Sequence, residues 1–136
     1  MPESLAAYVP VVWAMGTSGV LLLVQLLVVD FAGLRSGHVP GTPVAPDHGV
    51  FMFRAARAHA NTNESIAAFV LLSLFGIFSS ANASWLNVLA WAYVLGRVVH
   101  MICYYADQRL ARTASFAVSV AALFGMFVSG ALPWFT

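Results

Sequence analysis

Charged residues are scarce in this 136-residue chain, and lysine is absent altogether. Only 8% of the residues are charged, namely six arginines and five acidic residues, whereas 61% are hydrophobic. A soluble domain usually carries roughly 25% charged residues. Charge this sparse nearly excludes a soluble globular enzyme, and the hydrophobic content excludes a disordered chain. The net charge of +1 also provides no basic surface for binding nucleic acid.

Cysteine is limited to one residue, which excludes an internal disulfide. The sequence has long apolar runs instead. Because a membrane-spanning helix takes about 20 residues, about four spans fit into a chain of this length. The predicted fold is therefore all-α, a four-transmembrane-helix up-and-down bundle in a single integral-membrane domain of residues 1–136. The predicted helices cover about 5–29, 50–79, 85–105 and 113–132.

Glycine and proline cluster between the first two predicted helices. Seven of them lie between Asp30 and Gly49, so we expect Asp30 to end the first helix and residues 30–49 to form a loop outside the hydrocarbon. Arginines flank this loop and the third connection, whereas the middle turn and both tails have none. The positive-inside rule then predicts a cytoplasmic loop at residues 30–49 and both termini outside the cytoplasm. Met1–Ala7 contains an acid and no basic residue, so we expect a retained membrane helix rather than a cleaved signal peptide.

The second predicted helix is unusually polar for a membrane span. At about 100° per residue, four polar side chains lie within about 80° of one another: Arg54, Arg57, Asn61 and Glu64. A charge at the bilayer centre costs about 2.5–3.5 kcal/mol on insertion scales, so such groups persist where they face protein, water or a polar ligand. Ion pairing with neighbouring helices, or snorkelling of part of the stripe to the interface, is the alternative to a ligand site.

The third predicted helix carries a second polar stripe, in which Arg97, His100, Tyr104 and Gln108 again lie within about 80°. An arginine inside a span requires a partner, and the candidates for Arg97 are Glu64 and a carboxylate of a bound ligand. Packing of the helix interface is the alternative role for His100 and Tyr104.

Arg112 begins the fourth predicted helix, where its permanent charge can hold an anion close to the positive end of the helix dipole. A topology signal is the alternative role. Together, the arginines of three helices, one glutamate and their hydrogen-bonding neighbours predict a small ligand that carries both signs, with at least two anionic points. Apolar helix walls beside such a site would admit a lipophilic second substrate from the bilayer.

Three segments of the sequence resemble the MAPEG family, the membrane-associated proteins of eicosanoid and glutathione metabolism. The octapeptide Arg57–Glu64 resembles the family signature R-A-H-x-N-x-x-E, and Gly96–His100, followed by Tyr104, resembles the helix-three motif. The stretch from Tyr104 to Gln108, followed by Arg112, resembles the approach to the fourth helix. The resemblance implies a four-helix bundle assembled as a homotrimer, with glutathione bound between subunits.

The resemblance also implies roles for individual residues. Arg112 matches the family arginine that stabilises the glutathione thiolate, and Arg109 is the alternative because the spacing after Tyr104 varies in the family. Ser65 stands where relatives often have asparagine or tyrosine. The remaining residues implied around glutathione come from two helices: Arg57, Asn61, Glu64, Arg97, His100 and Tyr104.

The leading hypothesis is a membrane-bound, glutathione-dependent transferase or peroxidase acting on lipophilic electrophiles or hydroperoxides through an arginine-stabilised thiolate. It implies glutathione or a similar thiol, a lipophilic small molecule, membrane lipid and further copies of the chain as partners, with no metal and no nucleic acid. A non-catalytic ligand-binding or scaffold protein of the same fold is the alternative, because the family has members without transferase activity. A proton-coupled exporter is disfavoured because the first helix has no acid before Asp30, and a haem or metal held by His59 and His100 is disfavoured further.

Overall fold

The computed structural model of the protein describes residues 3–135. Met1, Pro2 and Thr136, which the predicted domain and tails include, lie outside the described residues. A single turn, α1 (Glu3–Ala6), precedes four long helices, and a 3-10 turn, η1 (Leu132–Trp134), follows them. No strand occurs in residues 3–135, which confirms the all-α prediction. The long helices are α2 (Val9–Ser36), α3 (Phe51–Phe78), α4 (Ala83–Tyr105) and α5 (Arg109–Ala131).

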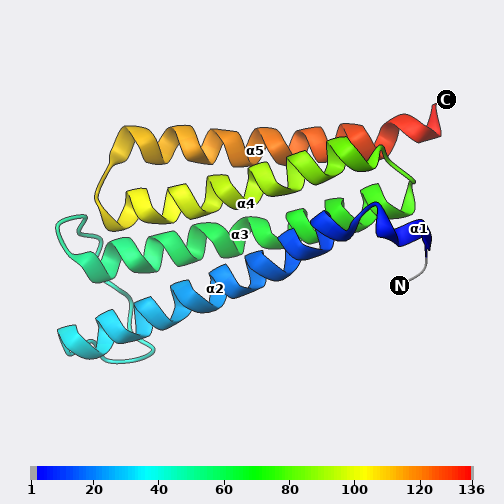
Figure 1. Ribbon diagram of the computed structural model, residues 1–136. Helices are drawn as coiled ribbons and strands as arrows, with labels where there is room; N and C mark the ends of the chain where they lie inside the picture. The colour runs from blue at the N-terminus through cyan, green and yellow to red at the C-terminus, as the bar shows by residue number, and fades with distance from the viewer. Residues whose placement is uncertain (1–2, 136) are drawn as a thin grey trace.

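The four long helices lie side by side with alternating directions, as an up-and-down bundle (Figure 1). Both termini lie at one end, called here the termini end, and the connections after α2 and α4 lie at the other, the loop end. Each long helix has the length and apolar composition of a membrane span, so the predicted count of four spans is confirmed. At 28 residues, α2 and α3 are about 42 Å long, so they tilt or extend beyond a hydrocarbon layer of about 30 Å.

The end predicted for the first long helix, at Asp30, is wrong, because α2 continues to Ser36. A lone glycine such as Gly33 weakens a helix by about 1 kcal/mol without breaking it. The helix ends where Gly37 adopts a left-handed φ of 69° and the His38 N–H donates to the Gly33 carbonyl at 3.0 Å, a Schellman cap. The loop therefore covers residues 37–50 rather than 30–49.

The fourth predicted helix begins four residues too late, because α5 starts at Arg109 rather than at residue 113. The polar residues before 113 suggested a longer connection. Instead, α4 ends in the same kind of cap as α2: Asp107 has a φ of 53°, and the Gln108 N–H donates to the Cys103 carbonyl at 2.8 Å. The turn is complete within three residues, which brings Arg109 and Arg112 into the first turn of α5.

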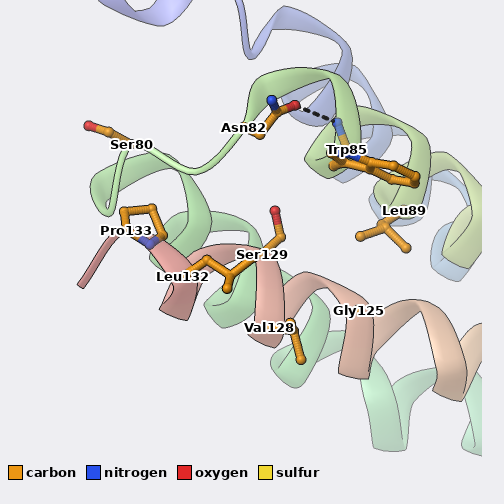
Figure 2. A pocket seen from close by; sticks show the side chains of 9 residues that line it. All are labelled: Ser80, Asn82, Trp85, Leu89, Gly125, Val128, Ser129, Leu132 and Pro133. Atoms are coloured by element: carbon orange, nitrogen blue, oxygen red, sulfur yellow. Dashed lines mark hydrogen bonds between the residues drawn. The ribbon is translucent and has the colours of Figure 1, made fainter. Parts of the chain in front are cut away.

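The connection between α3 and α4 is also short, at four residues, and α4 begins two residues earlier than predicted, at Ala83. Asn82 caps this helix, since its Oδ1 accepts the Trp85 N–H at 3.1 Å (Figure 2). Ser80 takes the left-handed φ, 55°, that lets the chain reverse after α3. The chain therefore turns tightly at this end and leaves α3 and α4 in direct contact.

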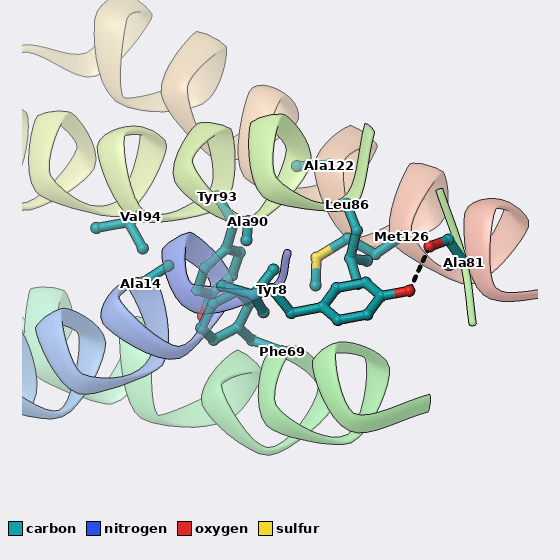
Figure 3. Close-up of a cluster of buried hydrophobic side chains, with 11 residues drawn as sticks. Tyr8, Ala14, Phe69, Ala81, Leu86, Ala90, Tyr93, Val94, Ala122 and Met126 are labelled. Carbon is teal, nitrogen blue, oxygen red and sulfur yellow. Dashed lines mark hydrogen bonds between the residues drawn. The ribbon is translucent and has the colours of Figure 1, made fainter. Parts of the chain in front are cut away.

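The hydrophobic core is filled by side chains from all four long helices and by Tyr8 (Figure 3). Phe69 of α3 stacks on Tyr93 of α4, with ring centroids 4.2 Å apart and an angle of 10° between the planes. The Tyr8 hydroxyl donates to the Ala81 carbonyl at 2.6 Å, which ties the start of α2 to the α3–α4 turn. These contacts hold the termini end together and leave the polar stripes to the loop end.

The helices α4 and α5 form the most closely packed pair in the bundle. A Cβ atom added at Gly96 would collide with Ser119 Oγ and would lie 3.1 Å from the Ser115 carbonyl oxygen. Small residues at such crossings let two backbones approach closely, which is how helices gain van der Waals contact in lipid. Gly96 therefore sets the spacing between α4 and α5 one residue before Arg97.

We expect Gly96→Val to lower the free energy of unfolding by roughly 1–3 kcal/mol, the usual cost of inserting bulk into a packed interface. The matched control is Gly19→Val, because nothing lies within 4 Å of a Cβ atom at Gly19. Thermal unfolding of both variants in detergent, followed by circular dichroism, measures the difference. Equal melting temperatures for the two variants would contradict the close approach at Gly96.

Candidate functional site

A cleft of about 190 Å³ opens at the loop end where α3, α4 and α5 meet. Asn61 of α3 and His100 of α4 line it, and α5 contributes Arg112, Thr113 and Phe116. The fold thus brings three predicted residues together: Asn61 and His100 from the two polar stripes, and Arg112 from the predicted start of the fourth helix. The cleft combines a permanent cation, an amide, an imidazole and a hydroxyl beside an aromatic wall.

Arg112 is half-buried at the edge of this cleft. Its Cζ atom lies 4.4 Å from the centre of the Tyr104 ring, a cation–π contact. Tyr104 is itself buried and meets the His100 ring edge-on, with centroids 5.1 Å apart. Arg109, the alternative from the sequence, is exposed and does not line the cleft. Arg112 is therefore the arginine that the fold orients toward the cleft.

Arg97 is almost completely buried, with 1% of its surface exposed, and does not line the cleft. Its Nη1 donates to Asn61 Oδ1 at 2.8 Å. The guanidinium lies between two aromatic rings, with its Cζ 5.5 Å from the centre of Tyr93 and 5.3 Å from that of Phe116. The sequence suggested Glu64 as a partner, but Glu64 is exposed and forms no ion pair with Arg97 in the part of the chain described.

The contact with Arg97 determines which way the Asn61 amide faces. A guanidinium has donors only, so it must meet the carbonyl oxygen of the amide and not its nitrogen. The Asn61 NH₂ group is then the part of the side chain that remains to donate to a ligand. An amide held in this way suits an anionic group such as a carboxylate, and Arg97 acts on the cleft through Asn61.

Arg57 and Glu64 are both exposed on α3. Arg57 lies one turn before Asn61 and Glu64 one turn after it, on the same face of α3, so the two residues continue the polar stripe outward from the cleft. Neither lines the cleft itself. The structure therefore divides the α3 stripe into one residue in the cleft and two on the open face of the helix. Its fourth member, Arg54, instead donates to backbone carbonyls at the loop end.

Two residues of the site were not predicted. Phe116 is four residues after Arg112, and Tyr93 is four residues before Arg97, so each lies one turn from a predicted residue on the same helix face. This four-residue spacing is the sequence signal that could have identified both residues. The Tyr93 hydroxyl also shares a hydrogen bond of 2.8 Å with Ser65 Oγ, so Ser65 supports the ring beneath Arg97.

Within residues 3–135, no group of three or more His, Cys, Asp or Glu is placed to hold a metal ion.

Four membrane spans define an integral, multi-pass membrane protein, and the arginine-bearing cleft lies at one end of its bundle. The MAPEG family model matches residues 10–132, so the chain belongs to the MAPEG family, as the sequence motifs indicated. It is accordingly a membrane protein of the family of glutathione and eicosanoid metabolism, whose members generally use glutathione. A search of curated proteins found no match.

Replacing Asn61 removes the side-chain acceptor of a buried charge. We expect Asn61→Ala to lower the free energy of unfolding by about 1.5–3 kcal/mol, the range for hydrogen bonds to charged groups. Asn63→Ala is the matched control, because Asn63 is exposed on the same helix, and should change stability by less than about 0.5 kcal/mol. Unfolding in detergent measures both variants, and a stable Asn61→Ala protein would show that Arg97 does not depend on this amide.

Proposed function

We propose that this protein is a membrane-bound, glutathione-dependent transferase or peroxidase that acts on lipophilic electrophiles or hydroperoxides. The observation that carries the proposal is the position of Arg112, whose guanidinium is fixed over Tyr104 at the edge of a cleft that also contains Asn61 and His100. Family membership supports glutathione as the thiol. Arg112 is the residue to which we assign stabilisation of the thiolate.

The charges around the cleft match those of glutathione, which has two carboxylates, one ammonium group and one thiol. Arg57 and the Asn61 NH₂ group are donors for the carboxylates, and Glu64 is the acceptor for the ammonium group. Because Arg57 and Glu64 are exposed beside the cleft, the tripeptide extends from the cleft along the open face of α3. His100 and Tyr104 complete the site, and Arg97 holds Asn61 in its donating orientation.

The chemistry follows from the ionisation of the thiol. A free thiol has a pKa of about 8.5 and is mostly protonated at neutral pH, whereas the thiolate is the nucleophile. A guanidinium beside the sulfur lowers that pKa by stabilising the anion. The thiolate then forms a carbon–sulfur bond as the leaving group departs with its electron pair. With a hydroperoxide, it takes the terminal oxygen to give a sulfenic acid and an alcohol, and a second glutathione converts the sulfenic acid into disulfide and water.

Two further properties belong to the proposal, a homotrimeric assembly and a membrane orientation. Arg57 and Glu64 are charged, exposed side chains within a membrane span of the single chain, and such groups require protein or water around them. A neighbouring copy supplies that surface. Arg35, Arg109 and Arg112 lie at the loop end, which the positive-inside rule assigns to the cytoplasm, with both termini outside.

Loss of the Arg112 guanidinium should slow the chemical step and leave ligand binding largely intact. We expect Arg112→Ala to lower kcat/KM for glutathione and 1-chloro-2,4-dinitrobenzene by about a hundredfold, the scale for removing one group that stabilises developing charge. Arg109→Ala, a change to an exposed arginine of the same helical turn, should retain the wild-type rate.

Two results would count against the proposed function. Equal rates for Arg112→Ala and Arg109→Ala would remove Arg112 from the mechanism. Calorimetric binding of glutathione by the wild-type protein, without turnover of any electrophile or hydroperoxide, would favour the non-catalytic ligand-binding alternative.

The proposed trimer can be tested directly by measuring the mass of the assembly. Native mass spectrometry of the detergent-solubilised protein should give a protein mass of about 44 kDa, three times the 14.6 kDa of one chain. Glu64→Arg places a second positive charge near Arg57 on the exposed face of α3 and should shift the population toward single chains, because like charges repel across a contact of low dielectric constant. A wild-type mass of one chain would refute the assembly.

A further inference from the structure

A second, larger cavity lies at the termini end, far from the cleft. It is a groove of about 680 Å³ between α4 and α5, which is within the usual range for ligand pockets. Trp85 and Leu89 of α4 form one wall, and Gly125, Val128 and Leu132 form the other (Figure 2). Thr113 of the cleft and Ser129 of the groove are 16 residues apart on α5, or about 24 Å along the helix. One small ligand does not occupy both.

One polar side chain of α5, Ser129, faces the groove. Ser129 has only 8% of its surface exposed, and its hydroxyl points into the groove (Figure 2). No hydrogen bond joins it to another residue that lines the groove. A hydroxyl that faces the groove can donate a hydrogen bond to an oxygen atom of a ligand there.

The lining of the groove also defines the charge of its ligand. Ser80, Asn82 and Ser129 supply the polar surface, and none of the nine lining residues is charged. A phosphate or carboxylate drawn into the groove would lose its hydration without meeting a cation. The chemistry is that of an uncharged, oxygen-containing group joined to a long apolar chain.

The position of the groove indicates where such a molecule comes from. Trp85 lines the groove, and Trp134 donates from Nε1 to Ser79 Oγ at 2.9 Å beside it. Tryptophan rings at the end of a span settle at the boundary between acyl chains and headgroups. The groove therefore opens at the depth where the ester and hydroxyl groups of glycerolipids lie.

We propose that this groove is a binding site for a neutral glycerolipid. One acyl chain lies between the apolar walls of α4 and α5, and an ester or hydroxyl oxygen accepts the hydrogen bond of Ser129. The Asn82 side chain meets the remaining uncharged oxygens at the rim. The site is separate from the cleft and does not depend on the thiol chemistry proposed above.

The test uses the full-length protein in micelles that contain a diacylglycerol at a few mole per cent, with native mass spectrometry as the readout. The wild-type chain should retain one diacylglycerol. Ser129→Ala should lower the retained fraction about threefold to tenfold, the effect of losing one hydrogen bond, and Ser129→Leu, which fills the groove, should abolish it. Ala121→Leu is the matched control, because Ala121 is an exposed residue of α5 outside the groove and should leave retention unchanged.

Parallel arms with a zwitterionic phosphatidylcholine and with an anionic fatty acid separate the lipid without charged groups from lipids that carry them. Absence of a retained diacylglycerol, equal retention of the charged lipids, or equal retention by Ser129→Leu would each overturn the proposal.

Fluorescence provides a second readout that needs no change at Ser129. A diacylglycerol brominated on its acyl chain should quench tryptophan emission in the wild type and much less in Trp85→Phe. Equal quenching in both, as when another copy of the chain covers the groove, would also overturn it.

Discussion

One permanently charged guanidinium inside the bundle constrains the whole loop end. Arg97 is buried among membrane spans, where a charge is costly unless hydrogen-bonded and surrounded by favourable groups. It meets no carboxylate in the part of the chain described, and its partners are the Asn61 amide oxygen and the faces of Tyr93 and Phe116. Each is weaker than an ion pair, so all three are needed together. They come from α3, α4 and α5, and the accommodation of Arg97 therefore fixes how those helices meet.

Tyr93 links this polar arrangement to the hydrophobic core. One face of its ring stacks on Phe69, the guanidinium of Arg97 lies near the ring, and its hydroxyl bonds to Ser65. Farther toward the termini end, the helices approach closely: a Cβ atom at Gly130 would lie 2.6 Å from the Phe75 ring. In lipid, where apolar side chains gain little by leaving the solvent, such close approach holds helices together. The rigid half of the bundle thus positions the half that carries the cleft.

The sequence predicted the number of spans and the two polar stripes, because both depend on composition and helical periodicity alone. It did not predict that α2 continues past Asp30, since the cap at Gly37 depends on backbone conformation and not on the density of glycine and proline. A helical wheel gives the angle of Arg97 but not the identity of the facing residue. Charge therefore suggested Glu64 or a ligand carboxylate, whereas the structure places the Asn61 amide against Arg97. Spacing also left Arg109 and Arg112 as alternatives. Of the two, Arg112 is half-buried and lines the cleft, whereas Arg109 is exposed and does not.

The two ends of α5 differ in their electrostatics, and this difference underlies the two different ligands proposed for them. At the loop end, Arg112 lies in the first turn, where the unpaired backbone N–H groups add their partial positive charge. An anion there gains from both. At the termini end, Ser129 lies in the last turn, where the carbonyl groups carry partial negative charge and no lining residue is a cation. A hydroxyl at that end donates to an uncharged oxygen, while an anion is repelled. The electrostatics of this one helix therefore favour the proposed thiolate at the loop end and the proposed neutral lipid at the termini end.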